Sequence, residues 1–557
     1  MNTIPETMLA WPLFGAGMEK LGKNDKPCRI PVPSIGDDEI LVRIDAIGLC
    51  FSDVKLIRAG ETHPRVISKN LAEDPVIPGH EAVMTIVSTG EKVSSEFKPG
   101  QRFIIQADIY VKGKGYAYGY AIDGGMAQYS RIDQRVLNGD EGCYLIPLPD
   151  NISAGIAALM EPWTCVKASY MIEHRANPLP GGSVLIASEK GNSAVYKAGQ
   201  ALQAARPSKI TVLNLSEAFI AELRNSFRNT EIETVGKISE EDLYDDLFLC
   251  DLRDKAFAEK LAKNCRKNAV INFIGDYPDE AWSFDVGNIH YQGWFYQGAK
   301  GKDLSAGYGR NLRSKLKEKG TCWLPGGAGA MGQMHTQLAV EAEDGPSRIL
   351  VSDMDNVRIS KVTALLSETI KKRGIEFKAL NPSSFSSPAE FDKAVKGFAP
   401  EGFDDIVMLV PVIPVLNGSA NHLKEDGLMN IFAGIPAGKE GLLNIKGIAG
   451  KGIRYIGSSG SLTAHLKHTL KLVEEKNLNP ATALAAIGGM NELKNGLEAV
   501  ANAKFPGKTV IFPNCENMPL TTMENIGNLS EKLKTTLDKD GFYTKKTEEK
   551  LFELFSN

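Results

Sequence analysis

The sequence predicts an α/β protein with one β-rich domain followed by two tandem doubly wound domains of parallel sheet. Short segments rich in β-forming residues, separated by Gly and Pro, fill the first part of the 557-residue chain. After Gly181, strand-like segments alternate with helical ones, and this alternating pattern occurs twice. The expected domains are residues 1–177, 178–317 and 318–462.

Composition and charge set the broad class of protein. The chain is 43% hydrophobic and 24% charged, with a net charge of −4, so nothing in its charge favours nucleic acid or an anionic membrane as a partner. No uninterrupted apolar run reaches membrane-spanning length, and the N-terminus lacks the pattern of a signal peptide. The eight cysteines form no CxxC pair, which argues against a disulfide framework. We expect a cytoplasmic protein.

Within the first domain, three segments are expected to be strands: residues 39–49, 83–90 and 101–108. The pattern changes after residue 150, where Ser153 can cap a helix. Apolar residues then recur at helical spacing, so we expect a helical region before the first doubly wound domain.

The two later domains repeat five strand-like segments in the same order. One matched strand would carry no weight, but five in order are not expected by chance. The matched pairs are 181–188 with 319–326, 209–216 with 348–355, 244–251 with 403–410, 267–276 with 426–435, and 287–298 with 450–461. The sequence therefore predicts a duplicated domain.

The second copy carries a glycine-rich turn typical of a dinucleotide site. Gly327, Gly329 and Gly332 follow a predicted strand and precede a helical stretch. These glycines allow a tight turn, a close approach to a pyrophosphate, and close packing of helix on strand. Asp353 ends the next strand, where a carboxylate binds ribose hydroxyls and repels a 2′-phosphate, so NAD is favoured over NADP. The alternative is a structural turn beside a solvated aspartate. The predicted cofactor contacts are Gly327, Gly329, Met331, Gly332, Asp353, Arg358, Val410, Gly434 and Ser458.

The first copy lacks this pattern. Glu189, Gly191 and Ala194 replace the three glycines, and Leu215 stands at the position of Asp353. A carboxylate at the turn would repel a pyrophosphate. We expect a structural role for this copy, such as packing between subunits or shaping a cleft, with a relict or altered ligand site as the alternative.

Three segments of the first domain carry the ligand types that zinc prefers. Cys50, His80 and Glu81 offer a thiolate, an imidazole and a carboxylate, and Glu161 stands in a Glu-Pro pair. Each alone has an ordinary explanation: a small buried residue, a solvated turn, or a helix start. Their combination and order require a common explanation.

Together these motifs resemble the zinc-containing medium-chain dehydrogenase/reductase family, in particular its polyol branch of sorbitol, threonine and sugar-phosphate dehydrogenases. The resemblance implies a GroES-like catalytic domain, completed by residues 463–557, and two Rossmann-type domains. Relatives are commonly dimers or tetramers, so we expect a homodimer or homotetramer. The similar segments are VIPGHEAVMTIVSTGEKVSSEFKPGQRF at 76–103, DGGMAQY at 123–129, LIPLPDNIS at 145–153, the GGAGAMG turn, and PGKTVIFP at 506–513.

The resemblance assigns a metal site to the first domain. It implies that Cys50, His80 and Glu81 hold one catalytic zinc, with Glu161 as a fourth ligand or as a ligand through water. Many relatives also carry a four-cysteine zinc lobe, but residues 104–129 contain no cysteine, so we predict no structural zinc.

The resemblance also assigns three catalytic positions. Asp53 matches the carboxylate that receives the N–H of the ligating histidine, and Ser52 matches the residue that relays the alcohol proton. Lys55 stands where alcohol dehydrogenases often have a histidine on the proton path, and His63 is a loop histidine that can join such a path. His335 and the pair His465 and His468 are expected to be packed or solvated rather than ligands.

These features predict a zinc-dependent, NAD-linked oxidoreductase that interconverts a secondary alcohol of a polyol, sugar or sugar phosphate and its ketone. The same site would serve a physiological ketose-phosphate reductase, which is the first alternative. The second alternative is a non-catalytic dinucleotide-binding protein. The retained metal-binding residues argue against it, because a pure binder has no need for an open zinc site.

Overall fold

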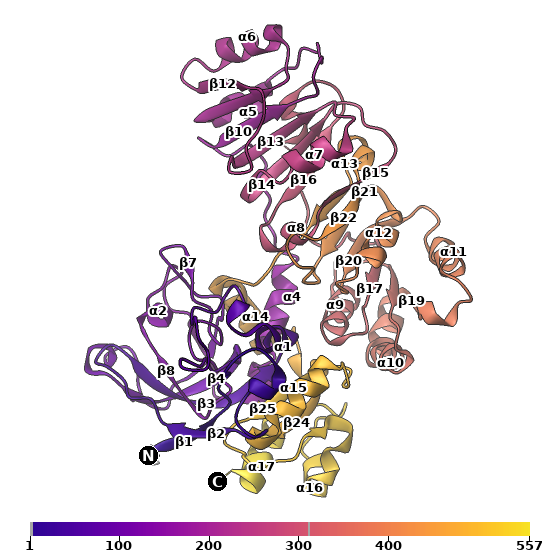
Figure 1. Cartoon of the computed structure of the whole chain (residues 1–557). Coiled ribbons are helices and arrows are strands. Elements are labelled where there is room, and N and C mark those ends of the chain that lie inside the picture. Colours follow the sequence, from indigo (N-terminus) through magenta and orange to yellow (C-terminus); the bar gives the residue numbers. More distant parts are fainter. Residues whose placement is uncertain (1–3, 310–311, 557) are drawn as a thin grey trace. The chain divides into compact units, whose positions relative to one another are not determined.

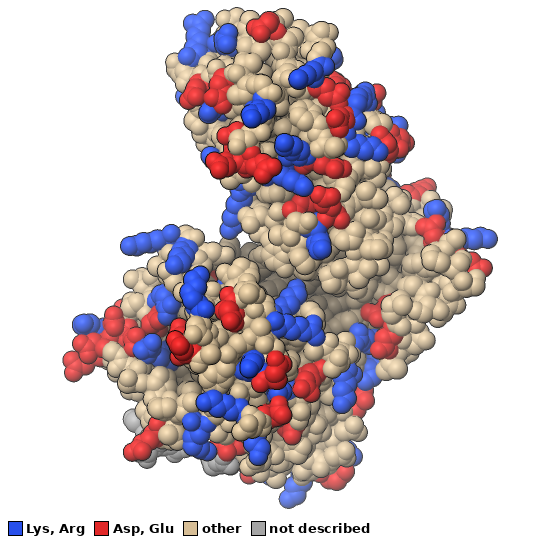
Figure 2. Space-filling model, viewed as in Figure 1, with Lys and Arg blue, Asp and Glu red and all other residues tan. Residues whose placement is uncertain are grey.

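The computed structural model describes residues 4–309 and 312–556 (Figure 1). The chain divides into two compact units: Met1–Lys167 together with Gly460–Asn557, and Ala168–Ser459. In the described ranges no helix is both long and apolar enough to span a bilayer. On the face shown in Figure 2, acidic and basic side chains are interspersed over both units, in keeping with the small net charge.

The first unit is built on an eight-stranded sheet. Seven strands lie in the order β26-β24-β25-β3-β4-β5-β9, and β8 also pairs with β3. The antiparallel pair β25 and β3 joins the C-terminal part of the chain to the N-terminal part, with Thr509 opposite Leu49. The bounds are β3 Ile40–Leu49, β4 Glu81–Thr89, β5 Arg102–Ile105, β8 Tyr129–Ile132, β9 Leu145–Pro147, β24 Leu484–Gly489, β25 Lys508–Phe512 and β26 Thr521–Thr522.

The three strands expected in the N-terminal region are confirmed as β3, β4 and β5. The helical region after residue 150 consists of α3 (Ala154–Ala157), which Ser153 caps by accepting the N–H of Ile156, and α4 (Met160–Ala168). The helix that positions the metal ligands is α1 (Phe51–Ala59), which follows β3 directly. Its buried Leu56 and Ile57 belong to the same hydrophobic core as Ile47 of the sheet.

The second unit contains two parallel six-stranded sheets with the same strand order. The first sheet has the order β12-β11-β10-β13-β14-β16, and the second has β19-β18-β17-β20-β21-β23. This is the doubly wound order, with the crossover between two halves at the central strands. The first sheet comprises β10 Ser183–Ala187, β11 Lys209–Leu213, β12 Glu231–Val235, β13 Tyr244–Cys250, β14 Cys265–Ile274 and β16 Phe295–Ala299. The second comprises β17 Thr321–Pro325, β18 Arg348–Ser352, β19 Glu376–Leu380, β20 Phe403–Met408, β21 Leu423–Ile431 and β23 Arg454–Ile456.

The duplication extends to a buried side-chain network in each copy. In the first, Arg175 pairs with Asp246 at 3.0 Å and donates to the carbonyl of Asp245. In the second, Arg313 pairs with Asp405 and donates to the carbonyl of the preceding aspartate. The two neighbouring aspartates of each copy therefore anchor the segment that enters each domain.

The fourth and fifth predicted pairs of segments are out of register. Val270 lies beside Asp246 and Leu428 lies beside the equivalent Asp405, so the fourth pair is shifted by one residue. The fifth pair is shifted further. Tyr296 lies beside Ile271 in the first sheet, and Tyr455 lies beside Met429 in the second, so Tyr296 is the equivalent of Tyr455. Matching 287–298 with 450–461 would instead place Tyr296 against Ser459, a shift of four residues. Glycines recur in both segments and allowed the wrong match, whereas the ladders of parallel strands fix the correct one.

Candidate functional site

The three predicted metal donors meet where β3 ends and β4 begins. Cys50 follows β3, His80 precedes β4, and Glu81 is the first residue of β4. The antiparallel register places Gly48 opposite Glu81, which brings these two strand ends together. One ligand atom from each of the three residues lies within 4.8 Å of the others, and the described part of the chain has this single group of potential metal ligands.

Two glycines make room for this arrangement. A Cβ atom at Gly48 would lie 2.1 Å from Oε2 of Glu81, so any side chain there would displace the carboxylate. Gly79 has a φ of +101° and its Cβ would lie 2.8 Å from Cγ of Met126. The glycine before His80 is therefore needed both for backbone conformation and for space.

Asp53 holds two of the donors in place. Its Oδ1 lies 2.9 Å from Nδ1 of His80, and its Oδ2 accepts the backbone N–H of Cys50 at 2.9 Å. Asp53 is fully buried, and although burial lowers the pKa of His80, the charge of Asp53 outweighs it and raises that pKa well above its usual value. Because Nδ1 faces Asp53, Nε2 is the nitrogen left to bind a metal.

Glu81 has one oxygen in an ion pair and one without a partner. Lys508, on β25, donates to its Oε1 at 2.5 Å, and both side chains are almost completely buried. Its Oε2 is buried without a hydrogen-bond partner, which is costly unless another ligand reaches it. Burial lowers the pKa of Lys508, but the charges of Glu81 and Cys50 outweigh it and raise that pKa. A thiolate, an imidazole and an orphaned carboxylate oxygen fit zinc.

Glu161 lies near this group on α4 but is not one of the three clustered donors. Its Oε1 accepts a hydrogen bond from Sγ of Cys165 at 3.4 Å. Burial raises the pKa of Glu161 to about 7, and the charges of His80, Glu81 and Lys508 also act on it. A role for Glu161 as a fourth ligand stays a prediction.

The predicted proton-relay residues lie on α1, close to Cys50. Ser52 is half-buried in the first helical turn. Burial lowers the pKa of Lys55, and the charge of Cys50 opposes that shift, so the ammonium lies within electrostatic range of the thiol. Burial, together with Arg65 and Lys55, lowers the pKa of His63 to about 4, which makes this imidazole neutral at pH 7.

Tyr120 is an aromatic neighbour of the metal donors that the sequence did not single out. Its ring centroid lies 5.8 Å from that of His80 and 5.2 Å from that of His63, and the guanidinium of Arg65 lies 5.6 Å from it. Arg65 in turn pairs with Asp108 at 2.6 Å.

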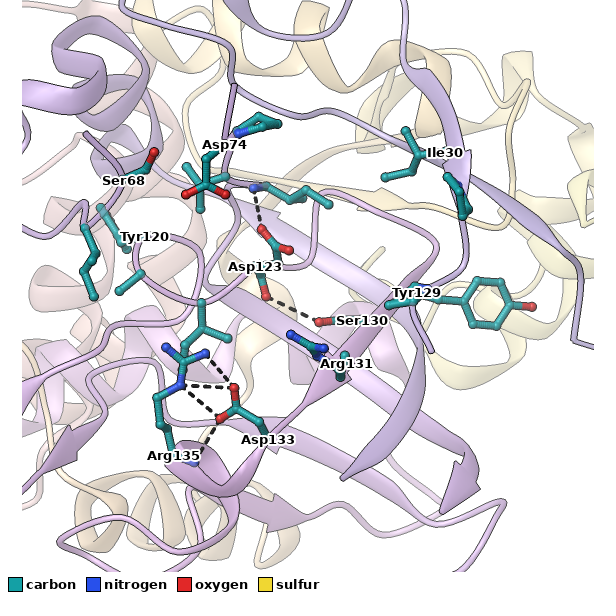
Figure 3. Close-up of a pocket in the computed structure, with 18 of the residues that line it drawn as sticks. Ile30, Ser68, Asp74, Tyr120, Asp123, Tyr129, Ser130, Arg131, Asp133 and Arg135 are labelled. Carbon is teal, nitrogen blue, oxygen red and sulfur yellow. Dashed lines mark hydrogen bonds and ion pairs between the residues drawn. The ribbon is translucent and has the colours of Figure 1, made fainter. Parts of the chain in front are cut away.

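Tyr120 also lines a cavity of about 720 Å³ in the first unit (Figure 3). Asp123 lines it as well and accepts the N–H of Ile77 at 3.0 Å, and Arg135 pairs with Asp133 along another part of the wall. Burial raises the pKa of Asp123. None of the three metal donors is among the residues that line it, but Tyr120 borders both the cavity and His80.

The predicted cofactor residues gather at the carboxyl edge of the second parallel sheet. The glycine turn follows β17, and Asp353 follows β18. Three further residues follow other strands of this sheet: Val410 after β20, Gly434 after β21 and Ser458 after β23. The last two lie in first helical turns, Met331 in α9 (Ala330–Glu341) and Arg358 in α10 (Asn356–Arg373). This edge, at the crossover between the two halves of the sheet, is where doubly wound folds bind ligands.

The three glycines of the turn differ in what surrounds them. A Cβ at Gly332 would lie 2.0 Å from the carbonyl oxygen of Gly326, and one at Gly327 would lie 2.9 Å from the hydroxyl of Thr336. At Gly329 the nearest atom would be 3.5 Å away, so the protein itself leaves room for a side chain. A glycine there is explained by a ligand that approaches the backbone, and the residues fit a dinucleotide.

In the first copy the corresponding turn has a different structure. The helix α5 (Gly199–Ala205) begins well after β10 ends at Ala187, whereas α9 begins soon after β17 ends at Pro325. Glu189 turns away and accepts the backbone N–H groups of Arg253 and Asp254. The strand–turn–helix geometry of a dinucleotide site is therefore lost, as the sequence led us to expect.

Two of the other histidines singled out in the sequence, His335 and His465, have structural partners. His335 is fully buried, its Nδ1 lies 2.7 Å from the hydroxyl of Tyr170, and burial lowers its pKa to about 3. His465 accepts the N–H of Leu462 at the start of α14 (Thr463–Glu474).

Comparison with known proteins agrees with this architecture. Residues 36–139 match the family model of the alcohol dehydrogenase GroES-like domain. The chain is 24% identical to mannitol-1-phosphate 5-dehydrogenase of Aliivibrio fischeri, over 92% of this chain and 89% of that protein. These matches support a relation to the medium-chain dehydrogenase/reductase family. The chain is also 26% identical to L-sorbose 1-phosphate reductase of Klebsiella pneumoniae, over 48% of the chain and 71% of that protein.

A solved structure shares the fold of this chain. The structure of 2R,3R-butanediol dehydrogenase from Bacillus subtilis superposes with a TM-score of 0.52 at 14% identity, covering 91% of this chain and all of the other. The relatives identify an oxidoreductase of the alcohol dehydrogenase type.

Proposed function

We propose that this dehydrogenase is zinc-dependent and NAD-linked, and that it interconverts a secondary alcohol of a polyol, a sugar or a sugar phosphate and the corresponding ketone. The observation that carries the proposal is the convergence of Cys50, His80 and Glu81, with one oxygen of Glu81 buried and unpaired. A protein that only bound a dinucleotide would gain nothing from such a set of donors.

When bound, zinc would supply Lewis-acid polarisation of the substrate hydroxyl, and NAD would supply the hydride acceptor. The chain positions these groups and moves the proton. Asp53 fixes the tautomer of His80, and Lys508 fixes one oxygen of Glu81. Ser52 is assigned the transfer of the hydroxyl proton, because it is the hydroxyl nearest in sequence to Cys50 on α1.

Asp353 supports NAD rather than NADP as the cofactor. Its Oδ1 accepts the N–H of Asp355, which fixes the carboxylate after β18, where it would meet the ribose hydroxyls. A fixed negative charge at this position opposes a 2′-phosphate. Ketose reduction is the second candidate for the physiological direction, and the relative named L-sorbose 1-phosphate reductase favours it.

The test combines metal analysis with a substrate screen. We expect about one zinc per chain in the purified protein, and reduction of NAD with one or more polyols, sugars or sugar phosphates. Cys50→Ser is expected to lose zinc and activity, while Cys143→Ser, at a half-buried cysteine outside the donor group, keeps both. A Cys50→Ser enzyme with normal turnover would refute the zinc assignment.

A further inference from the structure

The two copies in the second unit pair through an antiparallel strand from each. Strand β15 (Ala281–Asp285) pairs with β22 (Glu440–Asn444), with Ser283 opposite Leu442 and Asp285 opposite Glu440 (Figure 1). In this part of the chain, equivalent residues of the two copies are 159 positions apart, as Tyr296 and Tyr455 show.

That register has two-fold symmetry. Leu442 lies 159 positions after Ser283, so each of these residues faces its own equivalent. Asp285 faces Glu440, the equivalent of Ala281, and Ala281 faces Asn444, the equivalent of Asp285. A self-complementary contact of this kind is the property that defines an isologous interface between identical subunits.

A second pair of contacts repeats the same symmetry. Helix α13 (Ile445–Lys451) packs on β16 of the first copy, and α8 (Gly287–Tyr291) packs on β23 of the second. A Cβ at Gly298 would lie 3.1 Å from Cα of Ala449, and a Cβ at Gly457 would lie 3.0 Å from Cα of His290. Gly457 and Ala449 are the equivalents of Gly298 and His290, so the close approach of helix to backbone occurs once in each direction.

One face of the strand pair is buried and apolar. Trp282 of β15 and Leu443 of β22 are opposite neighbours in the strand pair and are fully buried. They belong to one hydrophobic core that contains residues of both copies. Full burial of large apolar side chains is typical of permanent rather than transient interfaces.

We propose that the first copy is a tethered partner for the second: an isologous dimer of nucleotide-type domains has been closed within one chain. A duplicated domain whose copies pair symmetrically keeps the contact by which two identical domains associate. This role needs the interface but no nucleotide, so it accounts for the loss of the glycine turn around Glu189 in the first copy. It also means that this face is already occupied and is closed to a second chain.

Engineered disulfides test whether the strand pair forms within one chain. Directly opposed residues of antiparallel strands have Cα atoms about 4.5–5.5 Å apart, within the range of a disulfide. The variant Ser283→Cys/Leu442→Cys is expected to form a cross-link that leaves the chain at the mass of 60.5 kDa under non-reducing conditions. A product of twice that mass would overturn the proposal, because the strands would then pair between chains. A cross-linked product of twice the chain mass from the single variant Ser283→Cys would also overturn the proposal, because β15 would then pair with β15 of another chain.

A second experiment tests the symmetry without relying on a cross-link. A Cβ at Gly287 would first meet Pro436 of the second copy, and one at Gly441 would first meet Val286 of the first copy. Gly287→Ala and Gly441→Val should therefore each push the two copies apart, and each should speed amide exchange in β15 and β22 together. Gly236→Ala is the control, because a Cβ there meets nothing within 4 Å. Faster exchange confined to the copy that carries the substitution would contradict a shared two-fold interface.

Discussion

Replacing Asp53 with asparagine tests how far the metal centre depends on one buried carboxylate. Asp53 accepts two hydrogen bonds, one from the imidazole of His80 and one from the backbone N–H of Cys50, both at 2.9 Å. Asparagine has the same shape but only one acceptor oxygen. In Asp53→Asn, one of the two N–H donors therefore faces an NH₂ group and loses its partner.

The size of the effect follows from these contacts. A hydrogen bond to a charged group contributes about 1.5–3 kcal/mol. Loss of one bond should therefore weaken zinc binding by roughly 10- to 150-fold, near the 10- to 100-fold range known for groups that orient metal ligands. Asp53→Asn should consequently release zinc at a lower concentration of chelator than the unmodified enzyme does.

Competition with a chromogenic zinc chelator measures this affinity directly. The matched control is Asp45→Asn, because Asp45 is also buried in the first unit and also has two partners, Arg43 and Thr85, but does not contact the metal donors. The control should bind zinc as the unmodified enzyme does. Equal affinity in Asp53→Asn and the unmodified enzyme would refute the idea that Asp53 orients the donors.

Three further predictions concern the rest of the molecule. Lys508→Met leaves the carboxylate of Glu81 buried without its cation. The free energy of unfolding of the metal-free protein, measured by denaturant titration, should therefore fall by about 3–5 kcal/mol. A loss below about 1 kcal/mol would contradict the buried ion pair. Asp353→Ser should raise the KM for NAD and reduce the discrimination against NADP, measured as the ratio of the two kcat/KM values; an unchanged ratio removes Asp353 from the cofactor site. Trp282→Ala opens a cavity between the two copies, because Trp282 is fully buried. The free energy of unfolding in the same titration should fall by about 3–5 kcal/mol. A fall within about 0.5 kcal/mol, typical of a surface residue, would place Trp282 outside the core.

The sequence predicted those parts of the site in which local pattern and ligand chemistry coincide. Cys50, His80 and Glu81 belong to short segments whose chemistry is visible in the residues themselves, and the glycine turn lies between a strand and a helix. The sequence did not identify Lys508 as the partner of Glu81. The two residues are 427 positions apart and are brought together only by the pairing of β25 with β3. No spacing rule within a segment identifies such a partner.

The duplicated domains were also predicted only in part. The first three pairs of repeat segments are in register because buried strands keep apolar residues in the same positions, and both copies kept the paired aspartates of their central strand. The fourth pair was misaligned by one residue, since an apolar run resembles itself at neighbouring offsets. The fifth pair was misaligned by four residues, since glycine-rich segments resemble each other at several offsets. The symmetric contact of β15 with β22 depends on how the copies meet in space, which the repeat alone does not specify.

The most direct test of the central claim is a crystal structure of the full chain with anomalous data collected at the zinc absorption edge. We expect one strong peak, at roughly 2.0–2.3 Å from Sγ of Cys50, Nε2 of His80 and a carboxylate oxygen of Glu81. An active enzyme with no peak there, or with its zinc bound elsewhere in the chain, would contradict it.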